Sequence, residues 1–480
     1  MRTSPSPRSI LTVTVLLFAC GGATPAAEEA AVADEAPAAR ETPSASGLES
    51  DAHARAVLAL APPRRARPLV AVLANDSGTE TTDFLVPYGI LARSDLADVV
   101  AVAPEAGPVT LLPALRIEAE TSFAAFDRRH PEGADYVVVP ALHDRDDPRV
   151  LDWIRRQSAA GAIVVGICSG AMVLSEAGLL ADRAFTTHWF DIDRLSRANP
   201  GGRRVDDRRY VVDRGVVTTT GVSASVPVSL LLVEAIGGRA RARALADALG
   251  VDDWSADHRS GAFELRSGQV ALALGNWLAF WRHERVGVPV RPAVDEVGLA
   301  FVADAWSRTF RSEAVSVSVD GAPIRTRHGL LLLPDASETD AEVDWQVDPA
   351  RLDSAARALD LVLRDMRCRY GREVAAFVAL QLEAAAPGLT RPDAEGPRSD
   401  VACEGEAPPR ARTSRQPKGS PRQISGALSW VRPDASRKIV PSETVIAQRS
   451  GPPAPSARAA MNASSIRAIP TSSGIDRDPS

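Results

Sequence analysis

The stretch AIVVGICSGAMVLSEA, residues 162–177, decides the fold. Its first residues are small or β-branched and favour a strand, and residues 171–177 are helix-like. A strand, a tight turn with a nucleophile between two glycines, and a helix form a nucleophile elbow, here with Cys168 where many hydrolases have serine. We expect the N-terminus of the following helix to lower the pKa of the Cys168 thiol. The alternative is a buried structural cysteine.

Short β-rich runs alternate with helical stretches around this elbow. The runs are residues 68–74, 98–103, 136–140 and 162–167, and residues 150–160 are a helical stretch. This alternation predicts an α/β fold with a doubly wound, mostly parallel sheet covered by helices on both faces. Residues 210–218 add a hairpin.

Residues 166–189, from the elbow to a Thr-Thr-His-Trp motif, resemble the ThiJ/PfpI superfamily of class I glutamine-amidotransferase-like proteins. The similarity is greatest to the branch with isonitrile hydratases and the N-terminal domains of AraC-type regulators. Two further motifs carry it: TDFLVP at residues 82–87, with an acidic residue four positions before a proline, and TTTGVSAS at residues 218–225. The resemblance covers about residues 67–250 and implies a flavodoxin-like sandwich.

The resemblance implies that Cys168, Asp83 and His188 are catalytic. Asp83 would share a proton with the sulfur, and an ordinary helix N-cap is its alternative. His188 would be a general base or a thiolate partner, and a packed, hydrogen-bonded histidine is its alternative. Gly166, Ser169 and Gly170 would shape the elbow and its oxyanion site.

The sequence departs from the superfamily pattern in two places. The loop at residues 141–144 lacks the usual glycines, whose N–H groups can help to form an oxyanion hole. No late His and Glu pair follows Thr220, so ammonia release from glutamine is not expected. No cluster of Cys, His and carboxylate residues has metal-ligand spacing, and neither a metal nor another cofactor is predicted.

The N-terminus resembles a bacterial lipoprotein signal. Arg2 and Arg8 precede a short apolar run at residues 10–19, and Leu-Phe-Ala-Cys ends at Cys20 as a lipobox does. This predicts that lipidated Cys20 anchors the protein to the bacterial cell envelope, facing the periplasm. A simple cleaved secretory signal is the alternative.

Composition and pattern divide the chain into six parts. They are a signal peptide (1–20), a disordered tether (21–66), the ThiJ/PfpI-like domain (67–250), an aromatic-rich helical bridge (251–290), a degenerate α/β segment (291–387) and a disordered tail (388–480). A net charge of −6 and the lack of a recognisable helix-turn-helix module predict no nucleic-acid partner.

The degenerate segment faintly repeats the first domain. Residues 298–310, 314–319 and 329–334 follow the order of residues 84–93, 99–103 and 136–140, but without an elbow cysteine. A terminal helix at residues 352–383 would pack on the first domain or on an identical subunit, so a homodimer is possible. The large apolar residues Trp277, Phe280 and Trp281 of the bridge are expected to be buried.

Two classes of function fit these features. The first is a cysteine-dependent hydrolase, hydratase or lyase that attacks a small electrophilic substrate. The alternative is a non-catalytic module that binds a small molecule or senses oxidation of Cys168.

Overall fold

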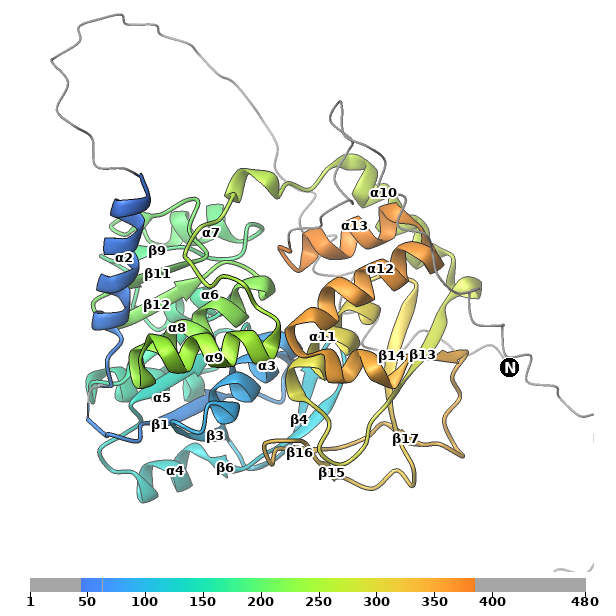
Figure 1. Cartoon of the computed structure of the whole chain (residues 1–480), viewed down its shortest axis with the longest axis horizontal. Coiled ribbons are helices and arrows are strands. Elements are labelled where there is room, and N and C mark those ends of the chain that lie inside the picture. Colours follow the sequence, from blue (N-terminus) through green and yellow to red (C-terminus); the bar gives the residue numbers. More distant parts are fainter. Residues whose placement is uncertain (1–44, 63, 385–480) are drawn as a thin grey trace, which may run out of the picture. The chain divides into compact units, whose positions relative to one another are not determined.

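The first segment is built on a seven-stranded sheet with the order β11-β12-β8-β7-β1-β3-β6 (Figure 1). The computed structural model describes residues 45–62 and 64–384. The strands are β1 (Leu69–Leu73), β3 (Asp98–Ala103), β6 (Thr121–Ser122), β7 (Tyr136–Val139), β8 (Ile163–Gly166), β11 (Tyr210–Asp213) and β12 (Val216–Thr219). All neighbours pair in parallel except the β11–β12 hairpin. The predicted doubly wound, mostly parallel α/β fold is confirmed.

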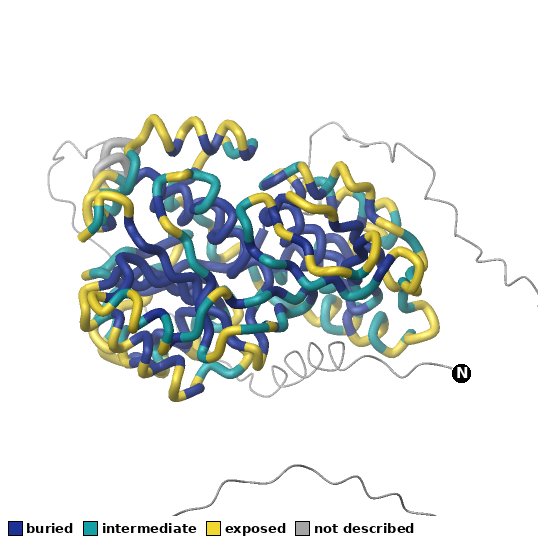
Figure 2. Tube along the Cα trace, turned by 90° about the horizontal axis from the view of Figure 1, so that it is seen from below, coloured by how far each residue is buried: buried dark blue, intermediate teal, exposed yellow. Residues whose placement is uncertain are grey.

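Helices cover both faces of this sheet because successive strand residues point to opposite sides. Val70 and Val72 belong to the core under α3 (Thr81–Arg93), α8 (Ser225–Gly237) and α9 (Arg239–Leu249). Ala71 and Leu73 belong to the opposite core, under α4 (Phe123–Arg129), α5 (Pro148–Ala159) and α6 (Gly170–Glu176). Figure 2 shows the buried residues gathered in the interior and the exposed residues along the outer edges. Smaller elements are α7 (Ile192–Ala198), β9 (Ala184–Phe185), β10 (Arg203–Arg204) and the 3-10 turn η2 (Val222–Ala224).

A further helix, α2 (Ala45–Ala59), precedes the sheet and corrects one prediction. Ala56 and Val57 pack against the core, and the carbonyl of the buried Leu60 accepts a hydrogen bond of 2.6 Å from the Tyr136 hydroxyl. A disordered tether through residue 66 is therefore wrong for this part, because the helix and the buried Leu60 after it pack on the first domain.

The second segment has its own sheet, with the order β17-β14-β13-β18 and parallel pairing throughout. Its strands are β13 (Glu284–Pro289), β14 (Ser312–Ser318), β17 (Ala336–Ser337) and β18 (Trp345–Gln346). Its helices are α10 (Ser267–Leu278), α11 (Glu296–Ser307), α12 (Ala358–Tyr370) and α13 (Arg372–Gln381), with 3-10 turns η3 (Ser260–Ala262), η4 (Phe280–Arg282) and η5 (Pro349–Arg357). The remaining strands join both segments in the order β15-β16-β5-β4-β2, with β2 (Thr79–Glu80), β4 (Gly107–Leu112), β5 (Arg116–Ala119), β15 (Ile324–Arg325) and β16 (Leu331–Leu332).

The second segment is a shortened copy of the first and lacks the central part of the first segment. We call the two segments the first and the second copy. β1, α3, β5 and β6 each begin 215 residues (284 − 69) before β13, α11, β16 and β17. The sheet order β18-β13-β14-β17 matches β7-β1-β3-β6. However, residues 140–221 lie between β7 and η2, whereas only Val347 and Asp348 lie between β18 and η5. The copy therefore lacks the whole elbow region.

Two details of the predicted repeat are wrong. Residues 331–332 correspond to β5 and not to residues 136–140, whose counterpart is β18. The predicted single helix at residues 352–383 is interrupted at Gly371, which has φ 95° and ψ 163°. Gly238 has nearly the same angles, φ 83° and ψ 164°, between α8 and α9. The pair α12–α13 is thus the counterpart of α8–α9.

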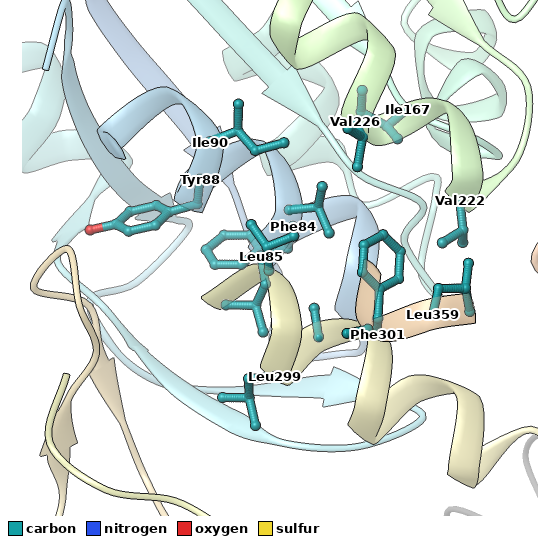
Figure 3. Packing of buried hydrophobic residues seen from close by; sticks show 14 of the residues in the cluster. Phe84, Leu85, Tyr88, Ile90, Ile167, Val222, Val226, Leu299, Phe301 and Leu359 are labelled. Atoms are coloured by element: carbon teal, nitrogen blue, oxygen red, sulfur yellow. The ribbon is translucent and has the colours of Figure 1, made fainter. Parts of the chain in front are cut away.

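Apolar packing of α3 against α11 joins the two copies. Figure 3 shows Phe84 and Leu85 of α3 beside Leu299 and Phe301 of α11, and all four belong to one buried cluster. Leu359 of α12 lies in the same cluster. The large, fully buried side chains of this cluster are removed from water on folding, and burial of apolar surface is the main favourable contribution to folding.

The aromatic bridge is exposed where burial was expected. α10 ends at Leu278, and Glu284 begins β13 instead of ending a helix. Phe280 is 55% exposed and Trp281 is 72% exposed. The predicted burial of these two residues is wrong, because α11 supplies the apolar surface that covers the first domain. Within the part of the chain that the structure describes, none of the helices has both the length and the apolar character to cross a membrane.

Candidate functional site

Cys168 lies in the sharp turn between β8 and α6. Its φ angle is 55°, in the left-handed region that a non-glycine residue seldom adopts. Two threonines hold its backbone: the Cys168 N–H donates to Thr219 Oγ1 over 3.0 Å, and Thr187 Oγ1 donates to the Cys168 carbonyl over 2.9 Å. The Thr-Thr-His-Trp and TTTGVSAS motifs therefore both contribute to keeping the elbow in its strained conformation.

The two elbow glycines are required by close packing. A Cβ atom on Gly170 would lie 2.1 Å from the carbonyl oxygen of Val139, at the end of β7. On Gly166 it would lie 2.8 Å from a methyl carbon of Leu174 and 3.1 Å from the backbone nitrogen of Ala171. The elbow can approach its neighbours this closely only without side chains at these positions.

Asp83 is fully buried near the N-terminus of α3. Its Oδ2 accepts a hydrogen bond of 3.1 Å from the backbone N–H of Ala141, and its Oδ1 has no hydrogen-bond partner. The N-cap of α3 is Glu80, whose carboxylate accepts from the Asp83 N–H over 2.5 Å. The N-cap alternative for Asp83 is therefore wrong, and its free oxygen is available to a neighbouring group.

Burial dominates the protonation of this site. Burial and the negative charge of Glu80 raise the pKa of Asp83 well above its usual value. Burial and the charges of Asp83 and Glu80 likewise raise the pKa of the Cys168 thiol. The lowering predicted from the helix N-terminus is wrong, because the Cys168 side chain is desolvated beside two carboxyl groups. Both shifts favour the protonated forms of Asp83 and Cys168.

The raised pKa of Asp83 predicts a pH-dependent stability. The folded chain keeps a proton that the unfolded chain loses near pH 4, so the contribution of Asp83 is full below about pH 4 and is lost as pH rises toward the raised pKa. Asp83→Asn cannot ionise, and its unfolding free energy relative to wild type should rise with pH by about 1.4 kcal/mol per pH unit in that range. Urea unfolding between pH 4 and 8 measures this difference.

Asp147→Asn is the control for this prediction. Hydrogen bonds from Arg149 lower the pKa of Asp147, so its stabilising effect is lost only below the usual aspartate range. Its difference from wild type should be flat between pH 4 and 8. A flat difference for Asp83→Asn as well would show that Asp83 is ionised in the folded protein.

His188 is held by backbone groups in this structure. Its Nε2 lies 3.1 Å from the carbonyl oxygen of Gln381, so Nε2 carries the proton, and its Nδ1 accepts from the Phe190 N–H at 3.4 Å. Among the described residues, neither ring nitrogen forms a hydrogen bond with Cys168. The general-base role of His188 stays a prediction that this arrangement does not support.

The Ser169 hydroxyl has hydrogen bonds on both sides. It donates to Asp191, and its Oγ accepts a long hydrogen bond of 4.0 Å from the Cys168 Sγ. The Ser169 backbone N–H does reach the sulfur, and it favours the thiolate against the opposing effect of burial. Ser169 thus contributes to this site through its backbone N–H as well as through its hydroxyl.

The second segment contributes groups that the sequence reasoning missed. Arg308, at the end of α11, donates to Glu80 over 2.5 Å and to Asp304 over 2.7 Å. Glu383 accepts from the Gly221 N–H over 2.6 Å and contacts His258 Nε2 at 2.8 Å. A repeat search could have found Arg308, because it stands 215 residues after Arg93 (308 − 93).

A surface pocket of about 420 Å³ lies beside the elbow. Thr187, which bonds the Cys168 carbonyl, forms part of its wall together with Trp189, Phe263 and Glu383. Cys168 itself is only 7% exposed and does not line the pocket. The pocket therefore adjoins the elbow backbone and does not open directly onto the sulfur.

The fold and the site define an α/β protein with a cysteine elbow and a buried carboxyl group. The DJ-1/PfpI family model matches residues 69–235. The chain is 31% identical over 160 residues to isonitrile hydratase from Pseudomonas putida, which covers 32% of this chain and 67% of that protein. The chain belongs to the DJ-1/PfpI family.

One further relative is a transcriptional regulator, and another is a solved structure. The HTH-type transcriptional regulator GlxA of Rhizobium meliloti is 28% identical over 311 residues, 61% of this chain and 91% of that protein. A mutant of a DJ-1 superfamily protein from Salmonella typhimurium, solved as a crystal structure, is 27% identical and has a TM-score of 0.34, covering 39% of this chain and all of that one. The family and its predicted branch are confirmed, whereas the absence of a nucleic-acid partner stays a prediction.

Several predicted features fall outside the described residues. These are Cys20 with the signal peptide, and the tail from residue 388. Within residues 45–62 and 64–384, no group of three or more His, Cys, Asp or Glu residues is arranged to hold a metal ion.

Proposed function

We propose that the Cys168 thiol adds to a small electrophilic carbon, and that Asp83 carries the proton for this step. One observation carries the proposal: Asp83 is a fully buried carboxyl group with an unpartnered Oδ1, and it lies near enough to Cys168 for the two groups to interact electrostatically. A protonated carboxyl group in this position can donate to a substrate and accept the proton of the thiol.

The similarity to isonitrile hydratase supports an isonitrile as the substrate class. The sulfur forms a bond to the terminal carbon of R–N≡C while Asp83 donates its proton to that carbon and takes the thiol proton. The product is a thioimidate, R–N=CH–S–Cys168. Water then adds to the same carbon, the C–S bond breaks, the sulfur regains its proton and an N-substituted formamide leaves. The net reaction adds one water to one isonitrile.

Hydration of ethyl isocyanide tests this function. We expect the full-length protein to form N-ethylformamide, measured by mass spectrometry, and Cys168→Ala to form none above the uncatalysed rate. Asp83→Asn should reduce the rate by about 100-fold or more, because it removes the proton carrier. Asp147→Asn, a change at another buried carboxylate, should keep wild-type turnover. No formamide from wild type, or undiminished turnover by Cys168→Ala, would refute the proposal.

A sensing role is the second candidate. It is supported by the similarity to a transcriptional regulator over 91% of that protein's length, and by the raised pKa of Cys168, which makes the thiol a weaker nucleophile. This role predicts that small ligands raise the melting temperature without being consumed, which the same preparations can test.

We also propose that the cell envelope is the place where this protein acts, through lipidation of Cys20. The lipobox-like residues that end at Cys20 support this. Partition of wild type, but not of Cys20→Ser, into a detergent phase tests it.

A further inference from the structure

The two copies meet in a reciprocal arrangement. Arg93 of α3 pairs with Asp295, the N-cap of α11, and Arg308 of α11 pairs with Glu80, the N-cap of α3. Each residue of one pair stands 215 positions from its equivalent in the other (295 − 80, 308 − 93). Such exchange of equivalent contacts is what a twofold-symmetric interface produces.

The strands that join the copies obey the same relation. Ile117 of β5 pairs antiparallel with Leu332 of β16, and these residues are equivalents of each other. The residues after the last helix of each copy also contact the other copy. Gly250 after α9 packs on Arg357 of η5, and the carbonyl of Leu382 after α13 accepts a hydrogen bond from the Ser223 N–H of η2. Three separate contacts therefore follow one pseudo-twofold axis within a single chain.

The two ends of this interface differ: the Arg308–Glu80 pair lies next to the Cys168 site, and the Arg93–Asp295 pair does not. Asp83 and Asp304 surround the Arg308–Glu80 pair, and the Thr82 hydroxyl lies 3.4 Å from Asp304. The equivalent positions at the other end are Gly298 and Gly89. These glycines sit in close contacts, because a Cβ on Gly298 would lie 1.9 Å from the Leu352 carbonyl oxygen and one on Gly89 would lie 3.0 Å from the Glu296 Cβ.

We propose that residues 284–384 are a built-in partner of the elbow domain, and that this partner supplies Arg308 as the positioning residue that neutralises Glu80 beside Asp83 and Cys168. The proposal rests on the proposed function in that it concerns the same thiol. The proposal also accounts for the missing elbow of the second copy, because a partner segment needs its contacts with the elbow domain and does not need a second site. A homodimer through α3 is then not expected, because α11 of the same chain covers that helix.

The charge balance gives the reason for Arg308. The carboxyl groups of Glu80, Asp83 and Asp304 lie around its guanidinium, which is charged at every physiological pH. An uncompensated Glu80 charge would oppose any negative charge on the nearby sulfur. The guanidinium is also near enough to attract a negative charge on Cys168. Arg308 thus makes a thiolate less costly without touching a substrate.

The alkylation of Cys168 by iodoacetamide tests the proposal. The rate is followed between pH 6 and 10 in the full-length protein by mass spectrometry of the Cys168 peptide. We expect Arg308→Met to move the pH profile upward and to slow alkylation at pH 8 by about tenfold or more, the usual effect of removing an opposite charge. Arg308→Lys should restore part of the rate, since it keeps the charge but cannot donate to Glu80 and Asp304 from two nitrogens at once.

Arg93→Met is the matched control, because it removes the equivalent ion pair at the end without a thiol. It should lower the melting temperature and leave the alkylation profile unchanged. Equal shifts in Arg308→Met and Arg93→Met, or no shift in either, would show that Arg308 is merely structural.

A double variant keeps the test decisive if Arg308→Met folds poorly. Glu80→Gln removes the charge that Arg308 neutralises, so Glu80→Gln/Arg308→Met should return the profile close to that of wild type. A shift that persists in the double variant would overturn the proposed route through Glu80. Because alkylation requires no substrate turnover, failure of isonitrile hydration would leave this result interpretable.

Discussion

Gly170→Ala is expected to lower the free energy of unfolding by about 3 kcal/mol or more, the upper part of the range for overpacking. The added methyl group would lie 2.1 Å from the Val139 carbonyl oxygen and 3.0 Å from that of Pro140. Both contacts are with backbone at the end of β7, which cannot rotate away as a flexible side chain would. Urea unfolding measures the loss.

Gly275→Ala is the control for this substitution. Gly275 lies in α10, and a Cβ there would meet no atom within 4 Å. Because alanine is the better helix former, this variant should be neutral or more stable by up to about 1 kcal/mol. If both variants unfold alike, the close packing of the elbow on β7 would be disproved.

Gly298→Ala is expected to have an effect of similar size in the second copy. Its methyl group would lie 1.9 Å from the Leu352 carbonyl oxygen, where α11 packs on η5. We expect a loss of about 3 kcal/mol or more in the free energy of unfolding, although alanine itself favours the helix.

The same variant links stability to the site, because α11 carries Arg308. A displacement of α11 should move the pH profile of Cys168 alkylation in the same direction as Arg308→Met does. Gly170→Ala and Gly298→Ala thus perturb the elbow from opposite sides. An unchanged melting temperature and an unchanged profile in Gly298→Ala would mean that the copy tolerates movement at this contact.

The sequence was sufficient for the parts of the site that depend on neighbours along the chain. A β-branched run, two glycines around Cys168 and a helical stretch specify a strand, a turn and a helix locally. Asp83 was likewise found from a short motif. The same reasoning failed for the protonation of both groups, because desolvation depends on which residues cover them.

The second copy shows more clearly what could not be predicted from the sequence alone. Its order of strands and helices could be recognised, but the counterpart of residues 136–140 was misplaced, since short apolar strands are hard to align without their sheet neighbours. The exposure of Phe280 and Trp281 was also unforeseen. An apolar composition indicates burial on average and does not say which surface of a domain is already covered by another element.

The sequence by itself determined the family, the α/β fold and the positions of Cys168 in the elbow and of Asp83 near the start of α3, because these follow from local geometry and from short motifs. Only the tertiary structure decided that the second copy packs on the first as a twofold partner. Arg308 reaches Glu80 across 228 residues of chain, and His188 is bound to the carbonyl of Gln381 across 193 residues. Such contacts set the charge, solvation and hydrogen bonding around Cys168, and no pattern of neighbouring residues specifies them.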